Sequence, residues 1–146
     1  MKLEGEFTFD APIATVWAIL NDPAVLKQHM PGCESLEPVG PDEYEAVLKI
    51  GVAAIKGTYK ARLRITDKQA PSAYRLHVDG SGKPGFVKGE GAVTLEAQGE
   101  RTVLRYSGDL QVGGLIARVG QRLLGGISER MTRDFFQGLG QSAEQA

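Results

Sequence analysis

The chain has 146 residues, of which 42% are hydrophobic and 24% are charged. This length and composition are typical of one globular domain, and they exclude a disordered chain and a coiled coil. Seventeen basic and 18 acidic residues leave a formal charge of -1, so no net field attracts nucleic acid. We therefore predict a single domain over residues 1–146 that has no nucleic-acid partner.

Cysteine usage and hydropathy bear on the location of the protein. The only cysteine, Cys33, has no internal partner for a disulfide, and no charged-then-apolar leader precedes the first predicted strand. We therefore expect a cytoplasmic protein. No apolar stretch approaches the roughly 18 residues that cross a bilayer, which leaves only peripheral contact with the inner face of a membrane open.

The first two thirds of the chain carry short helices followed by strands. Residues 2–10 alternate between polar and apolar side chains, which predicts a half-buried strand. Asp10 and Asp22 each precede a proline in a first helical turn, so two short helices are expected next. From residue 34 to residue 112 the period is two, with turn residues between short segments and no helix. This pattern predicts an antiparallel meander of about six strands.

The pattern becomes helical after Gly113. Apolar residues recur at intervals of three or four from Ile116 to Phe135, which predicts one long amphipathic helix. The element order indicates an α+β fold in which a curved antiparallel sheet of about seven strands wraps round this helix. Gly120, Gly125 and Gly126 fall inside the predicted helix. They either leave a cavity beside it, permit close packing on the sheet, or end the helix early.

The motifs that could carry chemistry are weak. The segment Gly80–Gly85 has the glycine spacing of a dinucleotide fingerprint, but it joins two strands rather than a strand and a helix. His29, His77 and Cys33 match no metal-ligand spacing. We therefore predict no cofactor, no metal and no catalytic residue. A nucleophilic pair of His29 with Cys33 is the enzymatic alternative.

Several blocks of the sequence resemble the CoxG family of proteins associated with carbon monoxide dehydrogenase. These blocks are Met30–Leu36, which contains a proline-glycine-cysteine signature, Gly85–Gly91, Thr102–Tyr106, Gly108–Ala117, Gly120–Leu124 and the pair Phe135-Phe136. The resemblance implies a helix-grip fold of the START/Bet v 1-like superfamily, with an apolar cavity between sheet and helix. It also implies an association with molybdenum-dependent carbon monoxide dehydrogenase-type enzymes, in membrane recruitment or in handling a quinone-like acceptor. Many members carry an apolar C-terminal anchor, whereas this sequence ends at Ala146, so we expect no permanent anchor.

Together these observations predict a non-catalytic binding or carrier protein for an apolar small molecule, a quinone or a lipid. Its partner would be a molybdenum hydroxylase-type dehydrogenase. The alternatives are a small enzyme of the cyclase or hydrolase type that uses the same cavity, and a structural adaptor that docks through its surface, where Lys60, Arg62 and Arg64 form a basic stripe.

Twelve residues are predicted to form the wall of the ligand cavity, and each fits an ordinary core position equally well. They are Leu26, Met30, Leu48, Ile50, Tyr59, Leu63, Phe86, Val93, Val112, Ile116, Val119 and Leu123. Among them Tyr59 is the expected polar handle, because its ring is apolar and its hydroxyl can form a hydrogen bond.

Overall fold

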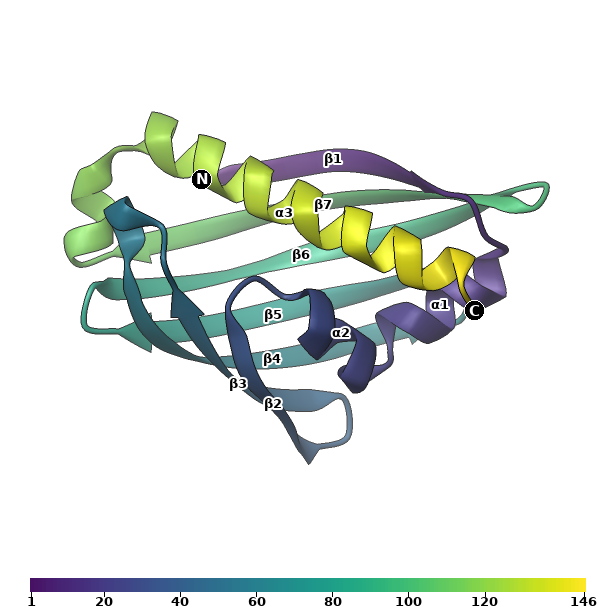
Figure 1. The fold of residues 1–146 in the computed structure, drawn as a ribbon, viewed down its shortest axis with the longest axis horizontal. Helices are drawn as coiled ribbons and strands as arrows, with labels where there is room; N and C mark the ends of the chain where they lie inside the picture. Colours follow the sequence, from purple (N-terminus) through teal and green to yellow (C-terminus); the bar gives the residue numbers. More distant parts are fainter.

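The computed structural model describes residues 1–146. The elements in chain order are β1 (Lys2–Phe9), α1 (Ile13–Leu20), α2 (Pro23–His29), β2 (Cys33–Gly40), β3 (Glu43–Ile50), the 3-10 turn η1 (Ala53–Ile55), β4 (Gly57–Gln69), β5 (Ala73–Gly82), β6 (Gly85–Gln98), β7 (Arg101–Gly113), the 3-10 turn η2 (Leu115–Val119) and α3 (Gln121–Glu144). The helices lie on one face of a single curved sheet, and α3 runs diagonally across it (Figure 1).

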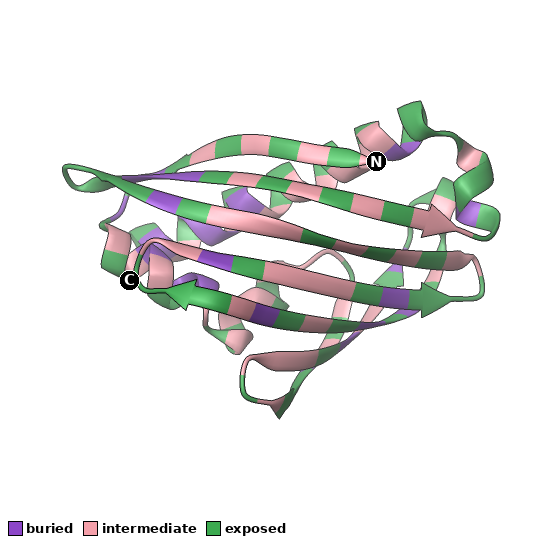
Figure 2. Cartoon of the chain, turned by 180° about the vertical axis from the view of Figure 1, so that it is seen from behind, coloured by how far each residue is buried: buried purple, intermediate pink, exposed green.

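The seven strands form one antiparallel sheet in the order β1-β7-β6-β5-β4-β3-β2. From β2 to β7 each strand pairs with the next, because the connections are too short for a parallel crossover. β1 pairs with β7 at the edge. The outer face shows exposed residues alternating with more buried ones along the strands (Figure 2). The predicted sheet is therefore confirmed.

The two short helices are present, but only one begins as predicted. The Asp22 side chain accepts a hydrogen bond of 3.0 Å from the Ala24 N–H and caps α2. No side chain caps α1, so the role predicted for Asp10 is wrong. The start of α1 is tied to the sheet instead by the buried Thr102 hydroxyl, which donates to the Ala11 carbonyl at 2.8 Å.

The C-terminal helix is shorter at its start than predicted. Leu115–Val119 forms the separate turn η2, and α3 begins only at Gln121. Gly120 separates the two elements because its φ of 97° lies in a region that favours glycine. Gly125 and Gly126 do lie inside α3. A Cβ at either position would meet no atom within 4 Å, so neither glycine permits close packing on the sheet.

The main core fills one end of the molecule, where α1 and the C-terminal half of α3 meet the sheet. Phe136 of α3 packs against three aromatic rings of the sheet, with centroid distances of 6.0 Å to Phe7, 6.4 Å to Phe9 and 5.3 Å to Tyr106. A second, smaller cluster comprises Leu36, Ala46 and Ala61. The two clusters are separate, and members of both line the space described next.

Candidate functional site

An apolar cavity of about 460 Å³ lies between the inner face of the sheet and the helices. Twenty of its 27 lining residues are hydrophobic, and every strand of the sheet contributes at least one of them. From α3 the wall takes Met131, Thr132, Phe135 and Phe136. The volume falls in the range of small-molecule pockets, about 300–1,000 Å³.

The floor of the cavity is hollow because glycines occupy inward positions of the neighbouring strands β6 and β7. Gly91 of β6 lies directly opposite Gly108 of β7, and Gly89 is the preceding inward position of β6. A Cβ at Gly91 would come within 2.8 Å of the Ser107 carbonyl oxygen, so the close approach of the β6 and β7 backbones also depends on this glycine. The cavity thus arises from glycines in strands, whereas the sequence analysis considered only those in the helix.

Five of the predicted wall residues line the cavity: Leu26, Met30, Leu48, Leu63 and Val93. The other seven do not. Ile50, Tyr59 and Ile116 are buried elsewhere, and Val112 and Val119 are partly buried outside the cavity. Phe86 and Leu123 are exposed, at 46% and 53%.

The structure shows why four of these seven predictions fail. Phe86 has the opposite parity to Val93 along β6, and in a strand alternate side chains point to opposite faces. Val119 and Leu123 were assigned to one continuous helix face, but the break at Gly120 changes the register between them. Tyr59 fails as a polar handle because its hydroxyl donates to the Ile55 carbonyl at 2.6 Å.

Sequence analysis missed the residues of α3 that do form the wall, and it missed three tyrosines and the inward glycines of the sheet. The missed residues include Met131, Thr132, Phe135 and Phe136 of α3, Tyr44, Tyr74 and Tyr106 of the strands, and Gly89, Gly91 and Gly108. Among these residues, the sequence carried a usable signal only for the glycines. Gly89 and Gly91 alternate within a strand, and a glycine inside a strand marks a bend or a missing side chain.

The polar groups of the cavity wall are chiefly tyrosines. The hydroxyls of Tyr44, Tyr74 and Tyr106 take part in none of the side-chain hydrogen bonds of the structure, whereas that of Tyr59 does. Burial raises the pKa of Tyr74 to about 12. Burial, and then the charge of Glu129, raise the pKa of Tyr106. The phenols of Tyr74 and Tyr106 therefore stay protonated at neutral pH and can donate hydrogen bonds.

The pair of His29 and Cys33 does not form. His29 Nε2 lies 2.7 Å from the Ser142 hydroxyl, and the Cys33 thiol donates to the Ser35 carbonyl at 3.3 Å. Neither residue lines the cavity. Burial raises the pKa of the Cys33 thiol, which disfavours the thiolate that a nucleophile needs. No group of three His, Cys, Asp or Glu side chains is placed to hold a metal ion.

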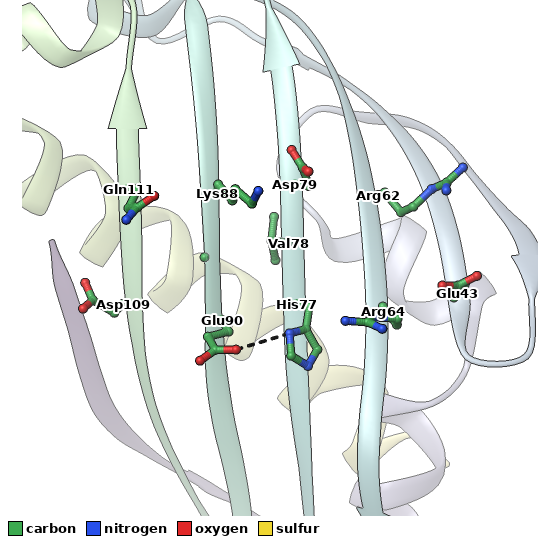
Figure 3. A pocket seen from close by; sticks show the side chains of 11 residues that line it. Glu43, Arg62, Arg64, His77, Val78, Asp79, Lys88, Glu90, Asp109 and Gln111 are labelled. Atoms are coloured by element: carbon green, nitrogen blue, oxygen red, sulfur yellow. Dashed lines mark ion pairs between the residues drawn. The ribbon is translucent and has the colours of Figure 1, made fainter.

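A second hollow, of about 570 Å³, lies on the outer face of the sheet and is charged (Figure 3). Acidic and basic side chains alternate there: Arg62 pairs with Glu45 at 3.0 Å, and His77 Nδ1 lies 3.4 Å from Glu90. The predicted basic stripe is therefore interleaved with carboxylates and presents no single-sign field. Exposed, mutually paired charges favour water over a small molecule, so we take the inner cavity as the candidate ligand site.

The curved antiparallel sheet, the long C-terminal helix across it and the apolar cavity between them form a helix-grip fold, which the chain shares with START/Bet v 1-like proteins. Within that class, the model of the carbon monoxide dehydrogenase CoxG family matches residues 5–144, and the chain belongs to this family. The resemblance found in the sequence is thus confirmed. None of the helices combines the length and apolar composition needed to span a bilayer.

Three solved structures illustrate the likeness. A conserved protein from Geobacillus kaustophilus is 39% identical, with a TM-score of 0.97 over 99% of this chain and 96% of that chain. A START superfamily protein from Mycobacterium smegmatis is 14% identical, with a TM-score of 0.80 over 99% and 97%. The Zhui aromatase/cyclase from Streptomyces sp. R1128 is 19% identical, with a TM-score of 0.73 over 99% and 94%. No curated protein matches the sequence.

Proposed function

We propose that this protein is a non-catalytic carrier that binds an apolar small molecule, a quinone or a lipid, in the cavity under α3. In this proposal it serves a carbon monoxide dehydrogenase-type molybdenum enzyme, as the name of its family suggests. The observation that carries the proposal is the cavity itself, about 460 Å³ in volume and mostly apolar in its lining.

The wall chemistry favours a largely apolar ligand with one or two hydrogen-bond acceptors. Burying about 300 Å² of apolar ligand surface gains roughly 7 kcal/mol at 25 cal/mol per Å², before the costs of ordering are subtracted. The hydroxyls of Tyr74 and Tyr106 remain protonated and can donate to a carbonyl oxygen. A quinone combines an apolar ring and tail with such carbonyl oxygens.

The lining also favours binding over catalysis. Chemistry at neutral pH usually employs a His, a carboxylate or a Cys whose pKa lies near 7. The cavity lining contains no His, Cys, Lys, Arg or Asp. Its one carboxylic residue, Glu90, directs its side chain to Arg75 and His77 on the outer face.

The test is calorimetric titration with a short-chain ubiquinone. The variant Leu63→Trp places a bulky side chain in the cavity, and Val119→Trp adds the same side chain outside it. We expect the wild type and Val119→Trp to bind equally, and Leu63→Trp to bind at least about tenfold more weakly, a loss of about 1.4 kcal/mol.

Thermal unfolding of both variants verifies that they are folded. If the wild type binds neither the quinone nor a fatty acid of similar size, the carrier proposal fails. It also fails if Leu63→Trp, while folded, binds as tightly as the wild type, because the ligand would then occupy another site.

A further inference from the structure

The short helix α2 forms part of the cavity wall but is itself poorly buried. Leu26 of α2 lines the cavity, together with Met30 and Pro31, which follow the helix. None of the seven residues of α2 is buried, whereas α1 and α3 each bury several side chains. Elements with few buried contacts open locally at a low cost in free energy. α2 is therefore a part of the wall that can open while the rest of the protein stays folded.

α2 also bridges the two core clusters between which the cavity lies. Leu26 packs against both clusters, and Met30 packs against the smaller one. The helix contacts α3 and lies beside it on the same face of the sheet (Figure 1). The first turns of α3, by contrast, contribute no wall residue, since those of α3 begin at Met131. Displacement of α2 would therefore uncover the cavity.

The backbone on either side of α2 is fixed, which confines any movement to the residues between. The Asn21 N–H donates to carbonyls in the last turn of α1. The Lys49 N–H of β3 donates to the Gly32 carbonyl at 2.8 Å. None of the backbone hydrogen bonds outside the regular elements joins residues 22–31 to a segment beyond these two links. We call residues 22–31 the α2 segment, which can move without unpairing the sheet.

A single polar contact ties the α2 segment to α3. His29 Nε2 forms a hydrogen bond of 2.7 Å with the Ser142 hydroxyl. Gly138, one turn before Ser142, makes room for the imidazole, because a Cβ at that position would collide with the His29 ring. The only other side-chain hydrogen bond of the segment is the cap from Asp22 to Ala24, which stays inside it. His29 and Ser142 thus hold the segment against α3.

We propose that the α2 segment is the lid through which the ligand enters the cavity, and that the hydrogen bond between His29 and Ser142 is its latch. The proposal rests on the proposed function, because it requires that the cavity takes up a ligand. In the closed state Leu26 and Met30 cover the ligand. When the latch opens, these two side chains move away with the segment, and the ligand can pass.

The first test is the rate of binding of a short-chain ubiquinone, followed by the fluorescence of Trp17. This only tryptophan reports on the cavity, because its ring centroid lies 5.7 Å from that of the wall residue Tyr74. Ser142→Ala removes the latch and should raise the association and dissociation rate constants about fivefold each, which corresponds to a hydrogen bond of about 1 kcal/mol. The Kd should change less than about twofold, because the latch closes the lid in both the free and the bound protein.

Thr66→Val is the matched control. It also removes a hydroxyl that forms a hydrogen bond with the Nε2 of a histidine, here His77 at 2.9 Å, but on the sheet and away from the lid. Both rate constants should equal those of the wild type. Thermal unfolding establishes that both variants are folded. A merely structural role of Ser142 would lower the melting temperature and leave the two rate constants unchanged.

The second test needs no ligand. In amide hydrogen exchange of the free protein, the amides of Leu26 and Met30, which are bonded inside the α2 segment, should be at least about tenfold less protected than the amide of Leu95 in the sheet. Ser142→Ala should lower their protection about fivefold further.

The two tests separate failure of the lid from failure of the carrier function. If the wild type binds no ubiquinone and no fatty acid, the proposed function fails, and hydrogen exchange alone decides whether the α2 segment opens. The lid is overturned if Leu26 and Met30 are as protected as Leu95. It is also overturned if Ser142→Ala leaves both rate constants unchanged, or if Thr66→Val raises them equally.

Discussion

Gly91 and Gly108, opposite each other on β6 and β7, show how single residues determine the volume under α3. Any larger side chain at these inward positions would occupy the floor of the cavity. At Gly91 it would also press on the Ser107 carbonyl. The polar groups of the cavity wall are also single side chains. They are chiefly hydroxyls, and that of Tyr74 is the most buried.

Tyr74 makes the stability of the protein depend on pH in alkaline solution. Burial raises its pKa to about 12, whereas an unfolded tyrosine has a pKa of about 10. Between these values the unfolded chain releases a proton that the folded protein keeps. Below pH 10 the protonated Tyr74 therefore makes its full contribution to the free energy of unfolding. As the pH rises from 10 towards 12, the free energy of unfolding falls by about 2–3 kcal/mol.

Urea unfolding of the wild type and of Tyr74→Phe, at pH 9 and near pH 12, checks this prediction. The variant lacks the titrating group, so its stability should fall less over this interval. Tyr59 and Tyr106, whose pKa values are also raised, remain in both proteins and cancel in the comparison. Equal losses in the two proteins would contradict the prediction.

At the scale of the element, α3 is held unevenly along its length. Its C-terminal half carries Phe136, Leu139 and Ala143, which are almost fully buried against α1 and β1. Its first turns carry Gly125 and Gly126, whose missing side chains face open space. The helix is thus packed most extensively in its C-terminal half, whereas in its first turns Leu124 is the buried residue.

We predict that Gly126→Ala stabilises the protein. The new methyl group meets no neighbour within 4 Å, and alanine in a helix interior is favoured over glycine by up to about 1 kcal/mol. Gly138→Ala on the same helix is the matched control, because its methyl group would collide with the His29 ring and should lower stability. Urea denaturation of the two variants measures both changes. The argument is wrong if both substitutions shift stability in the same direction.

At the scale of the whole molecule, the cavity lies between two core clusters, so its occupation by a ligand should stabilise the fold. The ion pairs contribute little by comparison, since they lie on the surface, where an exposed pair is worth about 0–1 kcal/mol. Filling the empty cavity is therefore the main way in which a ligand can change the free energy of unfolding.

We predict that a ligand at a hundredfold excess over its Kd adds about 2.7 kcal/mol to the free energy of unfolding. For a domain of this size the melting temperature should then rise by roughly 5–10 °C. Thermal unfolding with and without the short-chain ubiquinone measures the shift, which should persist in Val119→Trp and fall to about half or less in Leu63→Trp. An undiminished shift in Leu63→Trp would place the stabilising site elsewhere.

The sequence predicted the elements well because their signals are local. Alternation along the strands, turn residues between them and the cap at Asp22 depend on neighbours a few residues apart. The start of α3 was predicted too early because the apolar spacing continues through η2, while the backbone conformation of Gly120 interrupts the helix. The site was predicted in part, since Leu63 and Val93 line the cavity but Phe86 lies on the opposite face of its strand.

By itself, then, the sequence determined the succession of strands and helices, the antiparallel sheet and the family. Periodicity and matched blocks can each be recognised within a short segment of the chain. Only the tertiary structure decided that a space remains under α3 and which side chains face it. That outcome depends on residues brought together from distant strands, such as Gly91 against Gly108, and on whether a hydroxyl such as that of Tyr59 already has a partner. Packing between distant segments sums many small contacts, and no local pattern records the sum.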